Sequence, residues 1–260
     1  MSSFLWTTRR GFLIAGALAG ASGIAGTPAC TLTGEQEEGP YYIDDEKLRA
    51  DITEGRPGVP LKLRIALVDS RTCAPLANSA VDIWHCDALG VYSGFASSSP
   101  DGPPGGGRGF GRGPGSGPGR GRGPVDATRF LRGVQITDTK GVVEFSTLYP
   151  GWYSGRAIHV HMKTHMSGIG GHVAHTGQMF FPEDLTERIA RREPYATRLG
   201  VHRTTQSEDN VFRNQHGEEQ MASIERMGKT DEAGFIASFS VAVDPEASPR
   251  PVGGGGRGPR

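Results

Sequence analysis

The sequence predicts a mainly β protein, a single β-sandwich domain with few short helices and a long loop insertion rich in Gly, Pro and Arg. Short apolar stretches separated by turn residues recur along the chain, which is typical of β-sandwiches. Helical periodicity is sparse. Glycine is abundant, with 40 of 260 residues, but many of these glycines lie in residues 97–124 and 249–260. The rest of the chain has ordinary composition and is long enough to form one core.

The strand predictions rest on alternating apolar and polar side chains. Residues 61–67 (LKLRIAL) alternate strictly, which is the period of a half-buried strand. In the last apolar stretch, alternate residues from Phe235 to Val243 share one face. The predicted strands span residues 61–67, 80–85, 142–147, 157–163, 178–181 and 234–243.

One helix is predicted, over residues 182–191. Leu185 and Ile189 are four residues apart and stack on one face, and acidic residues occupy the first turn. Both features favour a short amphipathic helix.

The first 29 residues are typical of an export signal. Arg9 and Arg10 precede a weakly apolar run over residues 12–25, which is too short to span a bilayer comfortably. Paired arginines before such a run are typical of the twin-arginine (Tat) route in bacteria. We therefore expect an exported protein, periplasmic or extracellular, without stable membrane insertion after cleavage. A general secretory signal and an N-terminal anchor are the alternatives.

Three cysteines, Cys30, Cys73 and Cys86, leave at least one without a partner in the chain. If the strands at 61–67 and 80–85 formed a hairpin, Cys73 and Cys86 would lie at opposite ends of it, too far apart for a disulfide. The pairing, and lipidation of Cys30, remain open from the sequence.

The charged residues argue against nucleic-acid binding. The 28 Lys and Arg are balanced by 28 Asp and Glu, so the chain is not globally basic. Residues 97–124 contain four Arg within a Gly/Pro-rich context, a composition also found in RNA-binding segments. In an exported protein we expect instead a mobile surface loop inserted between strands, within a domain over residues 30–248. Residues 249–260 are expected to be a disordered tail.

The chemistry is predicted to lie in residues 149–161 (YPGWYSGRAIHVH). On a strand, His159 and His161 share a face, so their imidazoles form a natural pair of metal ligands. Two histidines without a ligand role are the alternative. Tyr153 and Arg156 directly precede the pair, and Tyr92 lies in a GVYSG turn after a predicted strand. The sequence contains no HExxH, CxxC or GxSxG motif that would indicate other chemistry.

A site of two histidines and two tyrosines selects a metal that tolerates phenolate. Phenols lose their proton near pH 10 in water, so only a strongly charged cation would hold them ionised at neutral pH. Fe(III) is the obvious candidate. A copper site is a more distant alternative.

These residues resemble the intradiol ring-cleavage dioxygenases, the family of protocatechuate and catechol dioxygenases. The resemblance covers residues 38–44 (EGPYYID), 73–94, 130–162 and 178–181. It is most specific in the block YSGRAIHVH. It implies a β-sandwich enzyme with one non-haem Fe(III) per chain. Such an enzyme uses O2 to open a catecholic small molecule between its two hydroxyl-bearing carbons, giving a muconate-type dicarboxylate.

The resemblance also implies roles for individual residues. The iron ligands would be Tyr92, Tyr153, His159 and His161. Arg156 matches the active-site arginine of the family, Tyr153 would also accept a substrate proton, and Gln178 would line the substrate pocket. The identity of the catechol and the oligomeric state are left open, because the insertion after Tyr92 departs from the family pattern.

Other residues are given secondary roles. We expect His85 to be a core or supporting residue. His165, His172 and His175 are expected to cluster around a loop, and Tyr41 and Tyr42 are not assigned to iron. The alternative for the whole protein is an exported β-sandwich binding module without catalytic activity.

Overall fold

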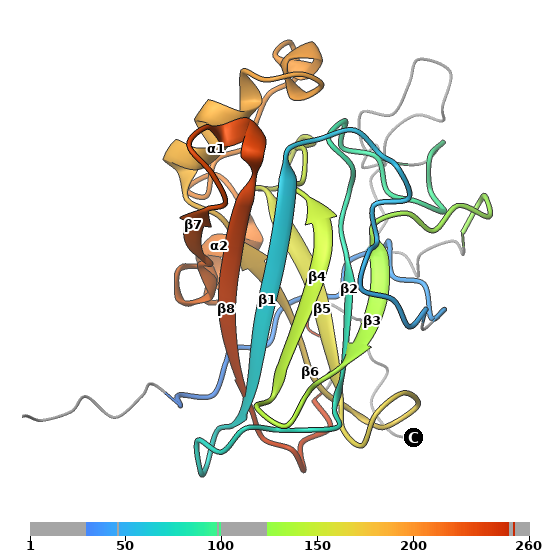
Figure 1. Ribbon diagram of the computed structural model, residues 1–260, viewed down its shortest axis with the longest axis vertical. Helices are drawn as coiled ribbons and strands as arrows, with labels where there is room; N and C mark the ends of the chain where they lie inside the picture. The colour runs from blue at the N-terminus through green and yellow to red at the C-terminus, as the bar shows by residue number, and fades with distance from the viewer. Residues whose placement is uncertain (1–29, 46, 98, 100–123, 250–251, 253–260) are drawn as a thin grey trace, which may run out of the picture.

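The structure, a computed structural model, describes residues 30–45, 47–97, 99, 124–249 and 252. Two four-stranded sheets form a β-sandwich (Figure 1). The first sheet has the order β4 (Val142–Leu148), β1 (Pro60–Asp69), β8 (Phe235–Val243) and β7 (Ser223–Arg226). The second has the order β3 (Arg132–Ile136), β2 (Ala80–Trp84), β5 (His159–His165) and β6 (Val173–Phe180). The predicted mainly β sandwich is confirmed.

The two sheets enclose the core through alternate side chains. Leu61, Leu63, Ile65 and Leu67 of β1 are buried while the residues between them are more exposed, as the alternation predicts. From the other sheet, Val160 and Met162 of β5 join the same core. Every residue of β5 is nevertheless buried, because its opposite face is also covered.

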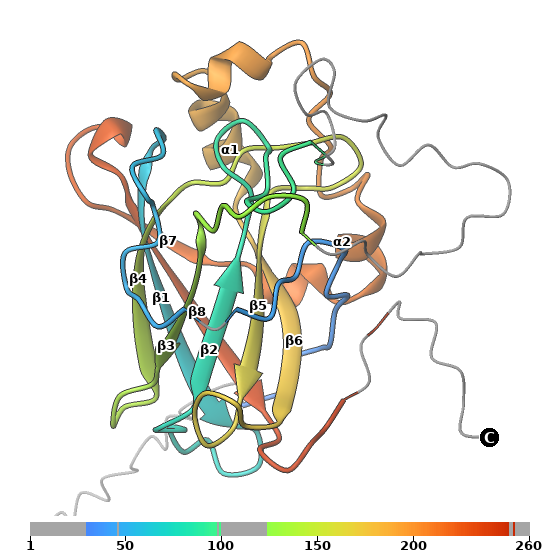
Figure 2. The same ribbon diagram turned by 90° about the vertical axis from the view of Figure 1, so that its right-hand side faces the viewer.

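Residues 30–45, here called the N-terminal strap, cover part of that opposite face. The Gln36 backbone N–H donates to Thr176 of β6, at 2.9 Å. Figure 2 shows the strap crossing the outer side of β5 and β6 close to the helix α2 (Asn210–Asn214). Nearer the start of the strap, the Thr33 backbone N–H donates to the Ala242 oxygen of β8, at 2.8 Å.

A disulfide between Cys30 and Cys73 fastens the start of the strap to the β1–β2 connection, with Cα atoms 5.4 Å apart. Cys86 is buried as a thiol. The sulfur of Cys30 is therefore bonded to that of Cys73. The hairpin considered for residues 61–67 and 80–85 is not formed, because β1 pairs with β4 and β8 while β2 belongs to the other sheet.

The helices are few. The predicted helix is found as α1 (Glu183–Ala190), with Leu185 and Ile189 buried. Short helical turns η1 (Tyr195–Arg198) and η2 (Gly217–Gln220) flank α2, and η3 (Asp231–Ala233) precedes β8. No helix in the described part of the chain is long and apolar enough to cross a membrane.

Several sequence-based predictions fall outside the described residues. These are the export signal over residues 1–29, nearly all of the insertion over residues 97–124, and most of the tail over residues 249–260. Within the tail, Val252 is described, and it forms a β-bridge with Glu37 of the strap.

Candidate metal and catalytic site

The centre of the candidate site is the histidine pair on β5. His159 and His161 lie on the face of the strand opposite to the core residues Val160 and Met162. Both imidazoles are buried, and their Nε2 atoms are 3.0 Å apart. The two rings therefore converge on one point.

Two tyrosines reach the same point from loops. Tyr92 follows β2 in a turn that begins at Gly90 and ends at Gly94, both with positive φ. Tyr153 lies in the loop before β5, in a turn closed by a β-bridge between Tyr153 and Arg156. The Tyr92 hydroxyl is 3.3 Å from the Tyr153 hydroxyl and 3.4 Å from His159 Nε2. The Tyr153 hydroxyl is 3.2 Å from His159 Nε2.

These separations fit donors around one cation. Nitrogen and oxygen ligands lie about 2 Å from a transition-metal ion such as zinc, and neighbouring ligands are then roughly 3 Å from one another. The four measured separations, from 3.0 to 3.4 Å, match this spacing. Among the described residues, no group of three His, Cys, Asp or Glu could hold a metal.

The protonation states also suit a metal. The Nδ1–H of His159 donates to the Ala157 carbonyl oxygen, at 2.6 Å, which leaves a lone pair on Nε2. His161 Nδ1 has no hydrogen-bond partner in the described part of the chain, while its Nε2 faces His159 Nε2. Burial lowers the pKa of both histidines well below its ordinary value, and nearby charges such as that of Arg156 lower it further. Both rings are therefore neutral.

The phenols, by contrast, need a cation in order to ionise. Burial raises the pKa of Tyr92 and of Tyr153 above the ordinary value for tyrosine. Without a metal both phenols are therefore protonated at neutral pH. A strongly charged cation would reverse this, as expected for Fe(III).

Aromatic stacking fixes two of the donors. The His161 ring stacks on Trp84 of β2, with centroids 4.9 Å apart and planes 4° apart. Tyr92 stacks on Tyr41 of the strap, at 4.3 Å. Gly39, with φ +72°, lets the strap approach His161, because a Cβ there would lie 3.2 Å from its Cε1 atom. The strap therefore helps to build the site.

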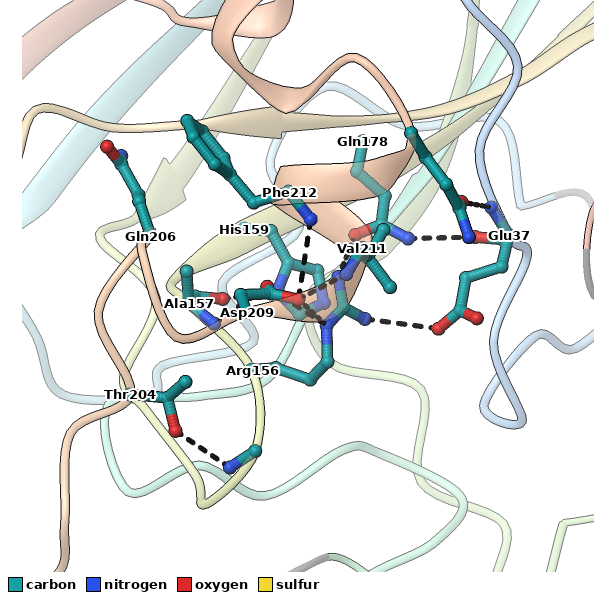
Figure 3. A network of polar contacts seen from close by, with 12 residues as sticks. Glu37, Arg156, Ala157, His159, Gln178, Thr204, Gln206, Asp209, Val211 and Phe212 are labelled. Carbon is teal, nitrogen blue, oxygen red and sulfur yellow. Dashed lines mark hydrogen bonds and ion pairs between the residues drawn. The ribbon is translucent and has the colours of Figure 1, made fainter.

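Arg156 lies beside the donor set within a polar network (Figure 3). Its Nε–H donates to the Asp209 carboxylate, with both oxygens at 3.1 Å, and its Nη1 is 3.4 Å from Glu37 Oε1. Its Nη2 donates to Gln178 Oε1. Burial alone would lower the pKa of Arg156, but Tyr153, Asp209 and Glu37 outweigh burial and raise it. Arg156 is a permanent cation.

The comparisons with solved structures agree with this geometry. An intradiol ring-cleavage dioxygenase from Tetranychus urticae is 33% identical; the match covers 85% of this chain and 98% of that one, with a TM-score of 0.72. The chain belongs to the intradiol ring-cleavage dioxygenase family. It is thus a dioxygenase of the ring-cleaving type. No protein-family model and no curated protein sequence matches the chain.

Two further solved structures are similar. A second dioxygenase crystal structure is 34% identical over 85% of this chain and 97% of that one, with a TM-score of 0.72. The dioxygenase domain of a carbohydrate-binding fusion protein from Streptomyces sp. SirexAA-E is 24% identical, covering 81% of this chain and 96% of that one, with a TM-score of 0.52. At that identity the likeness shows the fold alone.

Four other histidines named from the sequence, His85, His165, His172 and His175, have partners outside this group of four side chains. Both ring nitrogens of His85 are bonded within the core, Nδ1 to the Cys86 oxygen and Nε2 to the Thr147 hydroxyl, each at 2.8 Å. His85 is therefore a supporting residue, as predicted. His165, His172 and His175 lie on β5, β6 and their connection. Each has a separate partner, respectively Gly171, Pro245 and Glu35.

Several residues of this site were not found from the sequence. Trp84 stacks on His161 and Tyr41 stacks on Tyr92. Glu37 and Asp209 pair with Arg156. Asp209 carries the strongest local signal, because Asp is a preferred N-cap residue. However, the five-residue helix that it caps is too short to be recognised by periodicity.

Proposed function

We propose that this chain is a non-haem Fe(III)-dependent intradiol dioxygenase. It would use O2 to cleave a catecholic ring between the two hydroxyl-bearing carbons, giving a muconate-type dicarboxylate. The observation that carries the proposal is the convergence of two tyrosine hydroxyls and two histidine nitrogens, with measured separations of 3.0 to 3.4 Å. Its ligands would be Tyr92, Tyr153, His159 and His161, with one iron per chain.

The donor set favours Fe(III) over the softer or less charged metals. Two phenolates cancel two of the three charges of the ion and so disfavour its reduction to Fe(II). When bound, Fe(III) would act as a Lewis acid that draws charge from a catecholate and activates its ring toward O2. The two neutral imidazoles add no charge to this balance.

Tyr153 is the phenol best suited to take a proton from the substrate. Tyr92 is fully buried and is held by its stack on Tyr41. Tyr153 is slightly exposed and lies in a loop rather than under an aromatic ring of the strap. Away from the cation, a phenolate at this position would be a strong base, because burial raises the pKa of the metal-free Tyr153 phenol, and it could accept a catechol hydroxyl proton.

Arg156 would stabilise negative charge that develops on the substrate ring. Its guanidinium is a fixed cation and is already oriented before the reaction by Asp209 and Gln178. Preorganised charge of this kind is effective because it needs no rearrangement during the reaction. Gln178, with its amide oxygen on Arg156 and its nitrogen on the Glu37 carbonyl at 2.8 Å, would form part of the pocket wall.

We also propose that the protein is exported and acts in an oxidising compartment. The twin-arginine pattern at residues 9–10 and the Cys30–Cys73 disulfide both support this location. Cell fractionation tests the location. The full chain would be compared with a variant in which Arg9 and Arg10 are changed to lysine. Unchanged export of the Lys variant would contradict the twin-arginine route.

The experiment that tests the function combines metal analysis with oxygen uptake. The purified protein is expected to contain about one iron per chain and to show a visible tyrosinate-to-Fe(III) charge-transfer band. Oxygen uptake would then be measured with catechol, protocatechuate and hydroxyquinol to identify the substrate. A colourless protein that holds zinc or copper would contradict the proposal. Catechol binding without oxygen uptake would favour a non-catalytic binding module.

A further inference from the structure

We propose that Asp209 is the positioning residue that sets the direction of the Arg156 guanidinium. This inference rests on the proposed function and adds to it a residue outside the metal ligands and the substrate pocket. Asp209 lies more than fifty positions after Arg156 in the sequence, yet the two side chains are paired at 3.1 Å. Figure 3 shows the Asp209 carboxylate at the centre of the network that leads to Arg156.

In the Asp209–Arg156 pair the carboxylate is fully buried, and both of its oxygens face the same N–H of a largely buried arginine. Asp209 has no exposed surface, and both of its carboxylate oxygens lie 3.1 Å from Arg156 Nε. A buried charge that loses its partner is costly, so the two groups stay together. Because Nε joins the aliphatic part of the side chain to the planar guanidinium, holding it restrains the torsions that direct both Nη groups.

The same carboxylate also holds the backbone next to Arg156. Asp209 Oδ2 accepts the Ala157 backbone N–H at 2.9 Å. The Ala157 carbonyl in turn accepts the Nδ1–H of His159, at 2.6 Å. One carboxylate therefore secures the arginine and the residue that orients a metal-ligand imidazole, so the two groups are kept in register.

Asp209 is itself held by α2. Its Oδ1 accepts the backbone N–H groups of Val211 at 2.8 Å and Phe212 at 3.4 Å, the pattern of a helix N-cap. The carboxylate thus accepts hydrogen bonds from four N–H groups through two oxygens. An amide such as Asn has only one acceptor oxygen and could not satisfy both the α2 side and the Ala157 side.

The other Arg156 partners are weaker substitutes for Asp209. Glu37 Oε1 is 3.4 Å from Nη1, and the Glu37 side chain is 32% exposed. Gln178 accepts from Nη2 but carries no charge. Without Asp209, the Nε–H would be left without its buried acceptor, and Arg156 could turn toward Glu37 and away from the metal donors.

The test uses Asp209→Asn and Asp209→Ser in the iron-loaded, full-length protein. Both replacements are good N-cap residues, so α2 can be retained while the carboxylate is lost. We expect both variants to keep the iron and its visible band. The expected change is a fall in kcat of about 100-fold, the effect of a misplaced catalytic group, with little change in KM.

A second readout does not depend on turnover. Phenylglyoxal labels accessible arginines, and mass spectrometry identifies which ones react. Arg156 is expected to be protected in the original protein and labelled in both variants, with the other arginines as internal references. A role for Asp209 that was only structural would lower thermal stability without exposing Arg156 selectively below the melting temperature.

Asp231→Asn is the matched control. Asp231 is also a buried aspartate that pairs with arginines, including Arg226 at 3.2 Å and Arg188 at 3.4 Å. It lies on η3, and its ion pairs among the described residues are with arginines outside the network around Arg156. We expect this variant to lose some stability and to keep its kcat and the protection of Arg156.

The outcomes separate this inference from the proposed function. If the original protein cleaves catechols and both Asp209 variants retain normal kcat and Arg156 protection, the positioning role is wrong while the function stands. Loss of iron and fold in both variants would also overturn it, because Asp209 would then act by holding the structure. If the original protein lacks iron and turnover, the proposed function itself fails.

Discussion

At the scale of single residues, the four donors differ in what holds them. His159 is locked by a hydrogen bond to Ala157, His161 by its stack on Trp84, and Tyr92 by its stack on Tyr41. Within the described residues, the single ring of Tyr153 has no stacked partner and meets Tyr92 and His159 edge-on. Of the four donors, Tyr153 is therefore the one with most freedom to change partners during a reaction.

Tyr153→Phe tests that difference. The variant keeps the ring and loses the hydroxyl, so three donors remain. We expect iron to be retained in part, the charge-transfer band to shift or weaken, and kcat to fall by about 10²- to 10⁴-fold, the range for loss of a general acid–base group. Absorption spectra and oxygen uptake measure these effects. Normal turnover with an unshifted band would show that Tyr153 neither binds iron nor accepts a proton.

Arg156→Ala is expected to give a different pattern. The guanidinium contributes no donor to the metal, so iron content and the visible band should persist. Activity should fall by about 10²- to 10³-fold, as when a charge-stabilising group is removed from an active site. Steady-state oxygen uptake on the coloured variant checks this. Full activity would show that the cation does not stabilise the transition state.

His85 should make stability depend on pH. Burial lowers its pKa to about 4, whereas an exposed histidine titrates near 6.5. Between these values the unfolded chain binds a proton that the folded protein does not, so stability falls as the pH decreases from about 6.5 toward 4. Urea unfolding of the iron-free protein at several pH values measures the slope. His85→Gln should have a shallower slope, and an equal slope would refute the assignment to His85.

At the scale of elements, the N-terminal strap connects remote parts of the fold to the site. It supplies Tyr41 behind Tyr92, Gly39 against His161 and Glu37 beside Arg156. Lys163 of β5 also pairs with Glu38 of the strap at 2.5 Å. The Cys30–Cys73 disulfide holds the start of the strap, far from the site. Removing the disulfide should therefore affect the site only through the strap.

Removing the disulfide by changing both Cys30 and Cys73 to Ser tests this. A cross-link between residues 43 positions apart typically contributes about 2 to 4 kcal/mol to the free energy of unfolding, and we expect a loss in that range. Activity should decrease less than in the Arg156 variant, because the ligands on β5 stay in place. Urea unfolding and oxygen uptake measure both. No change in stability would show that the strap is held by its other contacts alone.

The strands that could be predicted from the sequence are those with clear alternation. Residues 61–67 correspond to β1 and residues 234–243 to β8. The strand β3 was missed because its sequence RGVQI contains Gly, Arg and Gln and shows no alternation, and β7 was missed because it has only four residues. The first five residues of β6 were missed because they include His and Gly. The sequence of the strap shows no strand pattern. Its contacts with the site form only in the folded protein, so they could not be predicted locally.

The candidate site could likewise be predicted only in part from the sequence. The ligands are recognisable because an alternating His pair and a YSGR turn lie close together in the sequence. Asp209 and Trp84 could not be assigned roles, because their partners are defined by sheet pairing and by a short helix. In this fold, local sequence indicates the metal donors, and long-range packing supplies the groups that orient them.

At the scale of the whole molecule, the two ends of the insertion meet beside the site. The Ser99 backbone N–H donates to the Phe95 oxygen at 2.7 Å, and the Val125 N–H donates to the Gly94 oxygen at 2.7 Å. The Ser99 hydroxyl also accepts the Tyr92 backbone N–H at 2.9 Å. Ser99, at the start of the insertion, therefore helps to hold the backbone of Tyr92 in place.

This arrangement predicts that the interior of the insertion can be removed. Replacing residues 101–122 with a short Gly/Ser linker should leave iron content and the visible band unchanged, provided that Ser99 and Val125 remain. Removing Ser99 as well should weaken the position of Tyr92 and lower iron occupancy. Metal analysis of the two deletions checks this. Loss of iron in the shorter deletion would show that the interior of the insertion is structural.

The proposed activity is defined by where the substrate ring is opened, and product identification from catechol in the presence of O2 tests this directly. Mass spectrometry and ultraviolet spectra of the product distinguish the two positions of cleavage. The account predicts a muconate-type dicarboxylate, from cleavage between the hydroxyl-bearing carbons, formed only by protein that contains iron. A semialdehyde from cleavage beside the hydroxyl groups, or turnover by iron-free protein, would contradict it.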